Sequence, residues 1–303
     1  MSPSSVSPRE HMQSNDLPRR QYRPGVDLSI VGLGGMVLVG MEQDSASRLV
    51  AESVERGVNY FDVAPSYGGG EAELKLGAAL EPYRDRVFLA CKTLERSAAG
   101  ARRELEQSLH RLRSGHVDLY QFHSVNKTAD VEQIFSSGGA MECVARAREE
   151  GLVRYLGFSS HSVPITLELL DRVEFDSVLF PVNYVCYACG NFGPQVVEKA
   201  HARGVACIAL KALAYTPWRE GETRNSKCWY RPIEDRALAR QALRFALSEK
   251  TCAVLPPGDE SSYRMTLELS ADLAPLTPDE RRSLLESARG LKPIMWAKKS
   301  GAR

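Results

Sequence analysis

The sequence lacks any apolar run long enough to cross a membrane, and its charges show no strong excess of either sign. A membrane-spanning helix needs about 20 consecutive, mostly apolar residues, and no segment of the 303-residue chain approaches this length. The 39 basic and 38 acidic side chains leave a formal charge of +1. Nucleic acids and anionic membranes attract strongly basic surfaces. The composition therefore predicts neither as a partner.

The first residues lack the apolar core of a secretory signal. Residues 1–25, MSPSSVSPREHMQSNDLPRRQYRPG, are polar and rich in proline, as disordered segments are. We expect a disordered leader over residues 1–20 and a single folded domain over 21–303.

The seven cysteines are odd in number and scattered along the chain. This pattern suits a reducing compartment, so we expect a cytoplasmic protein.

A cluster of metal ligands is also missing. Cys186 and Cys189 have the CxxC spacing of many zinc and redox sites, but a zinc site needs a second pair of ligands. The remaining cysteines in the second half of the chain supply none at a close spacing. We therefore predict no metal site and interpret the pair as part of an ordinary loop.

Eight short apolar runs, separated by helical patterns, are the main positive signal. Continuously apolar strands that alternate with helices are typical of a parallel sheet covered by helices. Eight such strands can close on themselves, so we predict an α/β fold, a (β/α)8 TIM barrel, in preference to a doubly wound sheet. The expected strands are 28–34, 57–62, 86–92, 117–123, 153–159, 177–183, 205–211 and 252–256.

The glycine cluster after the first run is an incomplete dinucleotide fingerprint. In GLGGMV, residues 32–37, Val37 stands where the pattern G-x-G-x-x-G needs its third glycine. No helix with capping signals follows directly. We interpret the cluster as a tight turn after a strand, which disfavours a Rossmann fold.

Polar side chains end three consecutive apolar runs. Asp62, Lys92 and His123 are the last residues of the second, third and fourth runs, and barrel enzymes carry their active sites at the carboxyl ends of the strands. A buried ammonium is costly unless a carboxylate pairs with it, so we expect Asp62 and Lys92 to form an ion pair. The pair alone is also compatible with a structural role, and His123 alone is more typical of a core histidine than of a catalyst. The addition of Tyr67, in the loop after Asp62, favours catalysis.

A tyrosine beside an ammonium is suited to protonating an alkoxide. The ordinary pKa of a phenol, about 10, is too high for efficient proton donation at neutral pH, and a nearby cation lowers it. We expect Lys92 to act on Tyr67 in this way while His123 hydrogen-bonds a substrate oxygen. The set fits the reduction of a carbonyl group. Because side chains do not donate hydride, the electrons must come from a cofactor.

The segment GVNYFDVAPSYGGGEAELKLG, residues 57–77, resembles the signature of the aldo-keto reductases. The Asp, Tyr, Lys and His of that family's active site fall on Asp62, Tyr67, Lys92 in LACKT and His123 in LYQFHSV. The resemblance extends over about residues 22–270. It implies a barrel that reduces a small aldehyde or ketone with NADPH, with Tyr67 as the general acid.

The resemblance also implies where the cofactor binds. Ser159 in LGFSSHS matches a contact to the nicotinamide carboxamide, and Ser160 replaces the family's asparagine. Phe180 occupies the position of a glutamine contact, for which Asn183 is the expected substitute. The further cofactor contacts implied are Gly35, Lys211, Gly258, Asp259, Ser262 and Arg264.

The preference between NADPH and NADH depends on one helix start. Residues 253–269, AVLPPGDESSYRMTLEL, read as a strand, a turn and a helix N-terminus, where a barrel commonly binds phosphate. The resemblance implies that Arg264 binds the 2′-phosphate of NADPH. Asp259 and Glu260 repel such a phosphate and suit a ribose hydroxyl, which leaves NADH as the alternative. Helix capping by Asp259 is the simpler interpretation of the same residue.

Substrate specificity is expected in the loops, where barrel enzymes vary. Residues 214–232 form a long loop after the seventh strand and contain Trp218 and Trp229. This loop either packs its own aromatic rings together or forms a wall of the substrate pocket. Trp296, in the C-terminal tail, is expected to lie over the barrel mouth and contribute to the same pocket.

Two other functions fit the same side chains. A Schiff-base lyase would use Lys92 as its nucleophile and Tyr67 as a proton donor, with no cofactor. A regulatory barrel that senses nicotinamide cofactors would retain the cofactor tightly and turn over slowly. The expected ion pair with Asp62 argues against the lyase, because it keeps Lys92 protonated.

Overall fold

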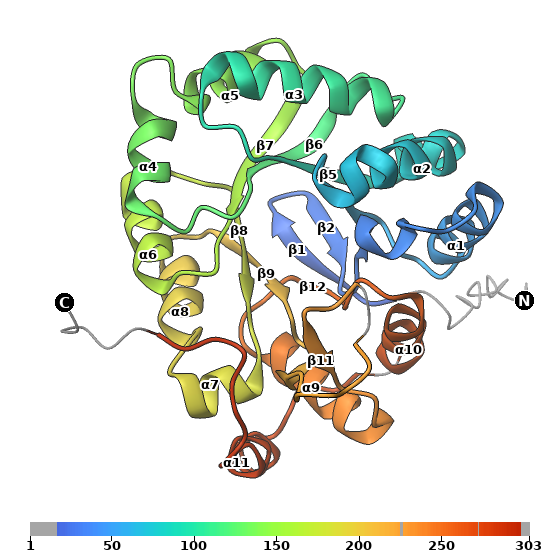
Figure 1. Cartoon of the computed structure of the whole chain (residues 1–303), viewed down its shortest axis with the longest axis vertical. Coiled ribbons are helices and arrows are strands. Elements are labelled where there is room, and N and C mark those ends of the chain that lie inside the picture. Colours follow the sequence, from blue (N-terminus) through green and yellow to red (C-terminus); the bar gives the residue numbers. More distant parts are fainter. Residues whose placement is uncertain (1–16, 225–226, 272, 298–303) are drawn as a thin grey trace, which may run out of the picture.

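Eight parallel strands form a barrel in the part of the chain that the structure describes (Figure 1). The structure is a computed structural model that describes residues 17–224, 227–271 and 273–297. A parallel bridge between Val31 and Val254 closes the sheet, so the predicted (β/α)8 barrel is confirmed. The barrel strands, in spatial order, are β3 (Leu33–Gly34), β4 (Tyr60–Asp62), β5 (Phe88–Thr93), β6 (Val117–Phe122), β7 (Val153–Ser159), β8 (Ser177–Pro181), β9 (Ala206–Leu210) and β12 (Ala253–Leu255).

The strands are mostly apolar because most of their residues are buried on both faces of the sheet. Successive side chains of a strand point to opposite faces. In β5, Phe88 and Ala90 belong to the cluster inside the barrel, whereas Leu89 and Cys91 belong to the cluster beneath the helices. This double burial produces the unbroken apolar runs that predict a parallel sheet.

Amphipathic helices cover the outside of the barrel (Figure 1). In α9, for example, Ala242, Phe245 and Ala246 lie on the buried side. The α-helices are α1 (Gln43–Glu55), α2 (Glu71–Leu80), α3 (Ala98–Arg111), α4 (Thr128–Phe135), α5 (Ala140–Glu149), α6 (Val163–Arg172), α7 (Tyr184–Gly190), α8 (Pro194–Ala202), α9 (Arg236–Ser248), α10 (Glu260–Ser270) and α11 (Pro278–Ser287). Short 3₁₀ helices are η1 (Gly35–Leu38), η2 (Tyr67–Gly70) and η3 (Glu81–Arg86).

The predicted first strand, 28–34, is wrong as a single element. Its first residues belong to β2 (Val26–Ser29), which forms an antiparallel hairpin with β1 (Arg19–Arg23), and only Leu33–Gly34 pairs with β4. Tyr22 and Leu28 of the hairpin pack into the cluster inside the barrel, and the Tyr22 hydroxyl donates to Ser177 Oγ at 3.0 Å. Ser177 begins β8, so the hairpin closes the amino-terminal end of the barrel.

The predicted leader, 1–20, extends too far into the chain. Residues 1–16 lie outside the described residues, but residues 17–20 belong to the fold. Leu17 is buried, and the Arg20 guanidinium donates to the carbonyl oxygens of Leu247 and Thr251. The sequence did not predict these contacts, because the segment is polar overall. Leu17 and Arg20, which anchor it, form no recognisable sequence pattern on their own.

The long loop after β9 contains a second hairpin. Its strands, β10 (Ala214–Pro217) and β11 (Tyr230–Pro232), pair antiparallel. After α11, the tail runs beside α7, where the Ala297 N–H donates to Gly190 O at 2.9 Å. None of the described helices is long and apolar enough to span a membrane.

Cys186 and Cys189 both lie on α7, and neither forms a disulfide. Cys186 is buried, and the Cys189 thiol contacts Ala288 O at 3.1 Å. Within the described ranges, no group of three or more His, Cys, Asp or Glu side chains is arranged to hold a metal.

Candidate active site

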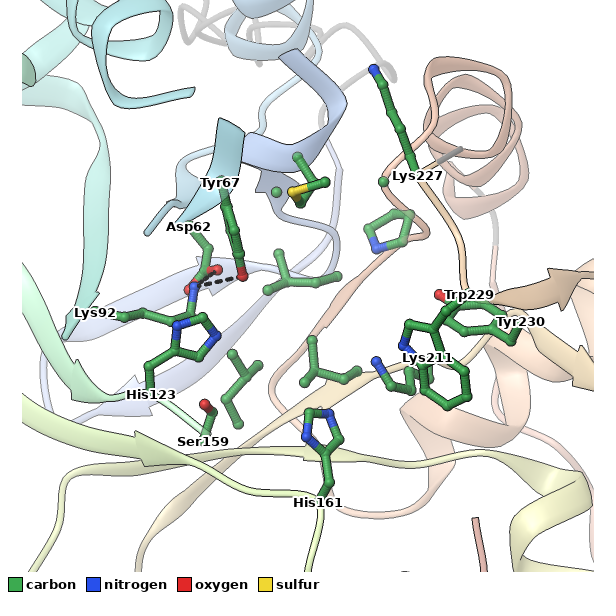
Figure 2. A pocket seen from close by; sticks show the side chains of 17 residues that line it. Asp62, Tyr67, Lys92, His123, Ser159, His161, Lys211, Lys227, Trp229 and Tyr230 are labelled. Atoms are coloured by element: carbon green, nitrogen blue, oxygen red, sulfur yellow. Dashed lines mark hydrogen bonds and ion pairs between the residues drawn. The ribbon is translucent and has the colours of Figure 1, made fainter. Parts of the chain in front are cut away.

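A cavity of about 280 Å³ opens at the carboxyl ends of the barrel strands (Figure 2). It brings together all four predicted catalytic residues: Asp62, Tyr67, Lys92 and His123. The other lining residues are Gly34, Met36, Ser159, His161, Leu179, Leu210, Lys211, Lys227, Trp229, Tyr230, Leu255, Pro256 and Gly258.

Asp62 and Lys92 form an ion pair at the base of this cavity. Asp62 ends β4, Lys92 lies near the end of β5, and their side chains are 2% and 0% exposed. The Lys92 ammonium also donates to Val63 O at 3.2 Å and to Tyr67 Oη at 3.3 Å. Together with the Asp62 carboxylate, these two oxygens accept from all three N–H groups of the ammonium. The phenol oxygen of Tyr67 is thus fixed beside a buried positive charge.

Two residues that sequence reasoning missed hold the Asp62 carboxylate. Tyr60 Oη and Gln121 Nε2 donate to Asp62 Oδ2 at 3.2 and 3.0 Å. The alternation of side chains along a strand and the register between strands would have predicted both residues. Tyr60 lies two residues before Asp62 and so on the same face, while Gln121 is the β6 residue in register with Lys92.

The Lys92 side chain is protonated near neutral pH. Burial on its own lowers the pKa of an ammonium, but the Asp62 carboxylate and the Tyr67 hydroxyl outweigh it, and the pKa of Lys92 lies above its ordinary value. An ammonium has no lone pair with which to attack a carbonyl carbon. The protonation state therefore suits Lys92 to stabilise negative charge on Tyr67.

The pKa of Tyr67 differs from the sequence-based expectation. Burial raises it above the ordinary value, and the Lys92 ammonium offsets only part of this rise. Tyr67 consequently carries its proton throughout the neutral range. Gly68 and Gly69, with φ of +62° and +64°, let the chain turn sharply after it, a conformation that glycine adopts at little cost. The turn directs Tyr67 over Lys92.

His123, the fourth residue of the predicted catalytic group, follows the end of β6. Its ring meets the Tyr67 ring edge to face, with centroids 5.8 Å apart. Burial, reinforced by Lys92, lowers the pKa of His123 to about 3, so the imidazole is neutral and has one N–H to donate. Its Nδ1 is buried without a hydrogen-bond partner in the described part of the chain.

Three of the predicted cofactor contacts line the cavity: Ser159, Lys211 and Gly258. Lys211 has a positive φ of +60°, and its ammonium lies 5.3 and 5.4 Å from the ring centroids of Trp229 and Tyr230. Burial lowers the pKa of Lys211 to about 8. Among the described residues, no carboxylate forms an ion pair with it.

Three other predicted contacts lie behind the cavity wall. Gly35 packs against Val63, and its neighbours Gly34 and Met36 line the cavity in its place. The Ser160 hydroxyl donates to Asn126 Oδ1 at 3.3 Å. The Asn183 side chain caps α7, where its Oδ1 accepts from Cys186 N–H, and its Nδ2 donates to Lys211 O at 3.1 Å and to Ala214 O at 2.6 Å. Asn183 therefore positions the backbone of Lys211.

The remaining predicted contacts belong to α10. Asp259 caps this helix, with Oδ1 accepting from Ser262 N–H at 2.9 Å, and Ser262 is buried. Arg264 lies on the surface, half-exposed, and pairs with Glu52 and Glu260 at 2.7 Å each. Of the cofactor contacts predicted in residues 253–269, only Gly258 lines the cavity.

The three predicted pocket tryptophans occupy three different places. Trp229, 58% exposed, lines the cavity. Trp218 lies in the β10–β11 hairpin region and donates from Nε1 to Cys228 O at 2.9 Å. Trp296, 61% exposed, lines a separate cavity of about 400 Å³ that shares His161 with the first.

Sequence reasoning also missed His161 and Lys227. His161 follows β7 two residues after Ser159, so strand alternation gives a signal for it. Lys227 lies in the long loop and reaches η1, where its ammonium donates to Val37 O at 2.8 Å. No local pattern predicts that contact, because it joins residues 190 positions apart.

The model of the aldo/keto reductase family matches residues 30–272. The chain belongs to this family. Among curated relatives, the uncharacterized oxidoreductase YqkF of Bacillus subtilis is 30% identical over 291 residues, which cover 86% of this chain and 93% of YqkF. L-galactose dehydrogenase of Arabidopsis thaliana is 28% identical over 204 residues, or 63% of each chain.

Solved aldo-keto reductases share the barrel. The holo form of AKR11C1 from Bacillus halodurans has a TM-score of 0.72 and 23% identity, covering 93% of this chain and 99% of that one. Bombyx mori AKR2E4 in complex with NADP has a TM-score of 0.67 and 19% identity, covering 89% and 92%. At this identity the likeness establishes the fold. Family membership makes the protein an oxidoreductase.

Proposed function

We propose that this aldo-keto reductase uses NAD(P)H to reduce an aldehyde or ketone to an alcohol, with Tyr67 as the general acid. The observation that carries the proposal is the hydrogen-bonded series from Asp62 to Lys92 to Tyr67 Oη, with the His123 ring beside it. A proton donor, a charge that stabilises its conjugate base and a neutral hydrogen-bond donor thus meet in one cavity.

The cavity lining suits a dinucleotide in its apolar surface and its charge. Leu179, Leu210 and Leu255 give it apolar walls on which a flat ring can pack, and the Lys211 ammonium suits a phosphate. The wall extends to Gly258, immediately before α10, where a helix N-terminus attracts negative charge. The Bombyx mori relative binds NADP, as its description states, which supports the same cofactor class here. Nicotinamide, when bound, supplies the hydride.

The protein's own groups handle the proton. A carbonyl oxygen beside Tyr67 and His123 accepts a hydrogen bond from each, which orients it and polarises the bond. As the carbon gains a hydride, the oxygen takes the Tyr67 proton and becomes the alcohol hydroxyl. The phenolate left behind is stabilised by the Lys92 ammonium at 3.3 Å, and Asp62 holds that ammonium in place.

Neither alternative function has an observation in its favour. A Schiff-base lyase needs a neutral amine, but the pKa of Lys92 is raised by its buried pair. A purely regulatory barrel has no need for a tyrosine, an ammonium and a neutral imidazole arranged around one point.

Cofactor binding tests the proposal directly. We expect NADPH to quench the fluorescence of Trp229, which lines the cavity, and to do so saturably at micromolar concentration. The ratio of the NADPH and NADH dissociation constants reports whether the α10 segment, with Asp259 and Arg264, favours a 2′-phosphate or a ribose hydroxyl. If a folded sample, verified by circular dichroism, binds neither, the proposed function is wrong.

The Lys211 side chain should make cofactor binding depend on pH. Because its pKa is about 8, the ammonium is present below that pH and is lost above it. The native protein should therefore bind NADPH more weakly as the pH rises from 7 to 9. Lys211→Met should bind about tenfold more weakly at pH 7, as expected for one charge-assisted hydrogen bond, and should show no such decline.

Isothermal titration calorimetry at each pH measures this effect. Lys199→Met is the matched control, since Lys199 pairs with Asp171 on the surface, and its affinity should follow the native curve. A Lys211→Met protein with native affinity at both pH values would show that the ammonium does not contact the cofactor.

A further inference from the structure

His161 is a polar side chain at the cavity to which the mechanism assigns no role. Its Nε2 is buried and has no hydrogen-bond partner within the described ranges, although a buried polar atom normally has one. Figure 2 shows its ring pointing from the end of β7 toward the cavity, on the side away from Tyr67. A molecule bound in a cavity that His161 lines would supply the missing partner.

The alternation of β7 selects His161 over its neighbour. Ser159 and His161, two residues apart, both line the cavity, whereas Ser160 does not. Ser160 is fully buried and hydrogen-bonds Asn126 Oδ1 and Ser162 O on the other side of the chain. Its hydroxyl is thus committed to the loop between β6 and α4.

Ser159 and His161 offer a donor and an acceptor to the same cavity. Ser159 Oγ accepts from Ser124 N–H at 2.8 Å, and its hydroxyl proton has no acceptor among the described residues. Burial and the nearby Lys211 ammonium keep His161 neutral, with a pKa lowered to about 3. A neutral imidazole carries its proton on one nitrogen, and in the tautomer with the proton on Nδ1 the Nε2 atom accepts a hydrogen bond. A primary amide, with a carbonyl oxygen next to an NH₂ group, complements this pair, whereas a carboxylate does not.

We propose that His161 Nε2 accepts a hydrogen bond from the NH₂ of the nicotinamide carboxamide, while the Ser159 hydroxyl donates to its carbonyl oxygen. This inference rests on the proposed function, because it presumes a nicotinamide cofactor. It makes His161, and not Ser160, the residue that recognises the amide and so fixes which way the nicotinamide ring faces.

The test compares two cofactors in equilibrium binding. The probes are NADP⁺ and its acetylpyridine analogue, in which a methyl ketone replaces the carboxamide and the N–H donor is lost. Native protein should bind the analogue about five- to tenfold more weakly, since His161 Nε2 then stays unpaired. Calorimetry measures both constants without any turnover.

Variants test whether the preference for NADP⁺ over the analogue depends on His161. His161→Leu should weaken NADP⁺ binding about five- to tenfold and leave the analogue unchanged, so that the two affinities become equal. Ser160→Ala should keep the native preference. His161→Gln, which retains an acceptor, should also keep most of it and guards against a packing effect of leucine.

Three outcomes would overturn the inference. They are an equal affinity of native protein for the two probes, an undiminished preference in folded His161→Leu, and a loss of preference in Ser160→Ala. The first and third need no His161 variant to fold. A different result would overturn the proposed cofactor function itself. It is that native protein binds neither NADP⁺ nor its acetylpyridine analogue, and also neither NAD⁺ nor the acetylpyridine analogue of NAD⁺.

Discussion

Replacement of Tyr67 by phenylalanine should reduce kcat for carbonyl reduction by about 10²- to 10⁴-fold, the usual contribution of a positioned general acid. The variant keeps the ring that packs beside His123 and loses only the hydroxyl, 3.3 Å from Lys92 Nζ. Cofactor affinity should stay within about threefold of native, because the cofactor contacts proposed above lie elsewhere in the cavity. Steady-state kinetics and a fluorescence titration measure the two quantities separately.

A matched control removes a phenol hydroxyl far from the site. Tyr155 packs against Tyr22 and Phe88 at the amino-terminal end of the barrel, so Tyr155→Phe should retain native kcat. A Tyr67→Phe protein that lost cofactor binding along with activity would mean that Tyr67 has a structural role. A variant with native kcat would remove Tyr67 from the mechanism altogether.

The convergence of Asp62, Lys92 and His123 could be predicted because barrel geometry is simple. Parallel strands bring their carboxyl ends to one face, so polar residues that end neighbouring apolar runs must meet there. No contact had to be known in advance. The same reasoning, extended to strand alternation, also reaches Tyr60 and Gln121, which hold the Asp62 carboxylate.

The first strand could not be predicted because its pattern is ambiguous. Residues 28–34 form one mostly apolar run, but Leu28 lies inside the barrel as part of a hairpin, and Leu33 pairs with Phe61 of β4. Both environments favour apolar residues equally. Only the tertiary contact of Tyr22 with Ser177 separates them.

The cofactor contacts are less predictable because they depend on where individual side chains point. The Asn183 side chain forms hydrogen bonds with three backbone groups of the protein itself. Nothing in the sequence distinguishes such an asparagine from one that faces a ligand. The pKa of Tyr67 is a similar case. The sequence reveals the nearby ammonium, but the extent of burial, which outweighs it, emerges only from packing.

Lys92→Met should destabilise the protein by about 3–5 kcal/mol, because it leaves the Asp62 carboxylate buried without its charge partner. The hydrogen bonds from Tyr60 and Gln121 remain but do not neutralise the charge. Urea unfolding followed by circular dichroism measures the loss. Tyr60→Phe is the matched control, since it removes one hydrogen bond of Asp62 and should cost only about 1 kcal/mol.

The destabilisation of Lys92→Met should also shrink as the pH falls. A buried carboxylate without a cation has its pKa raised above the unfolded value of about 3.9. The unfavourable charge is therefore present at high pH and is removed as the pH falls through the folded pKa. Asp62→Asn should restore stability in the Lys92→Met background at pH 7 without restoring activity. Two results together would contradict this explanation: a double variant as unstable as Lys92→Met, and a loss of stability that does not change with pH. The loss of stability would then come from packing around the methionine and not from the charge of Asp62.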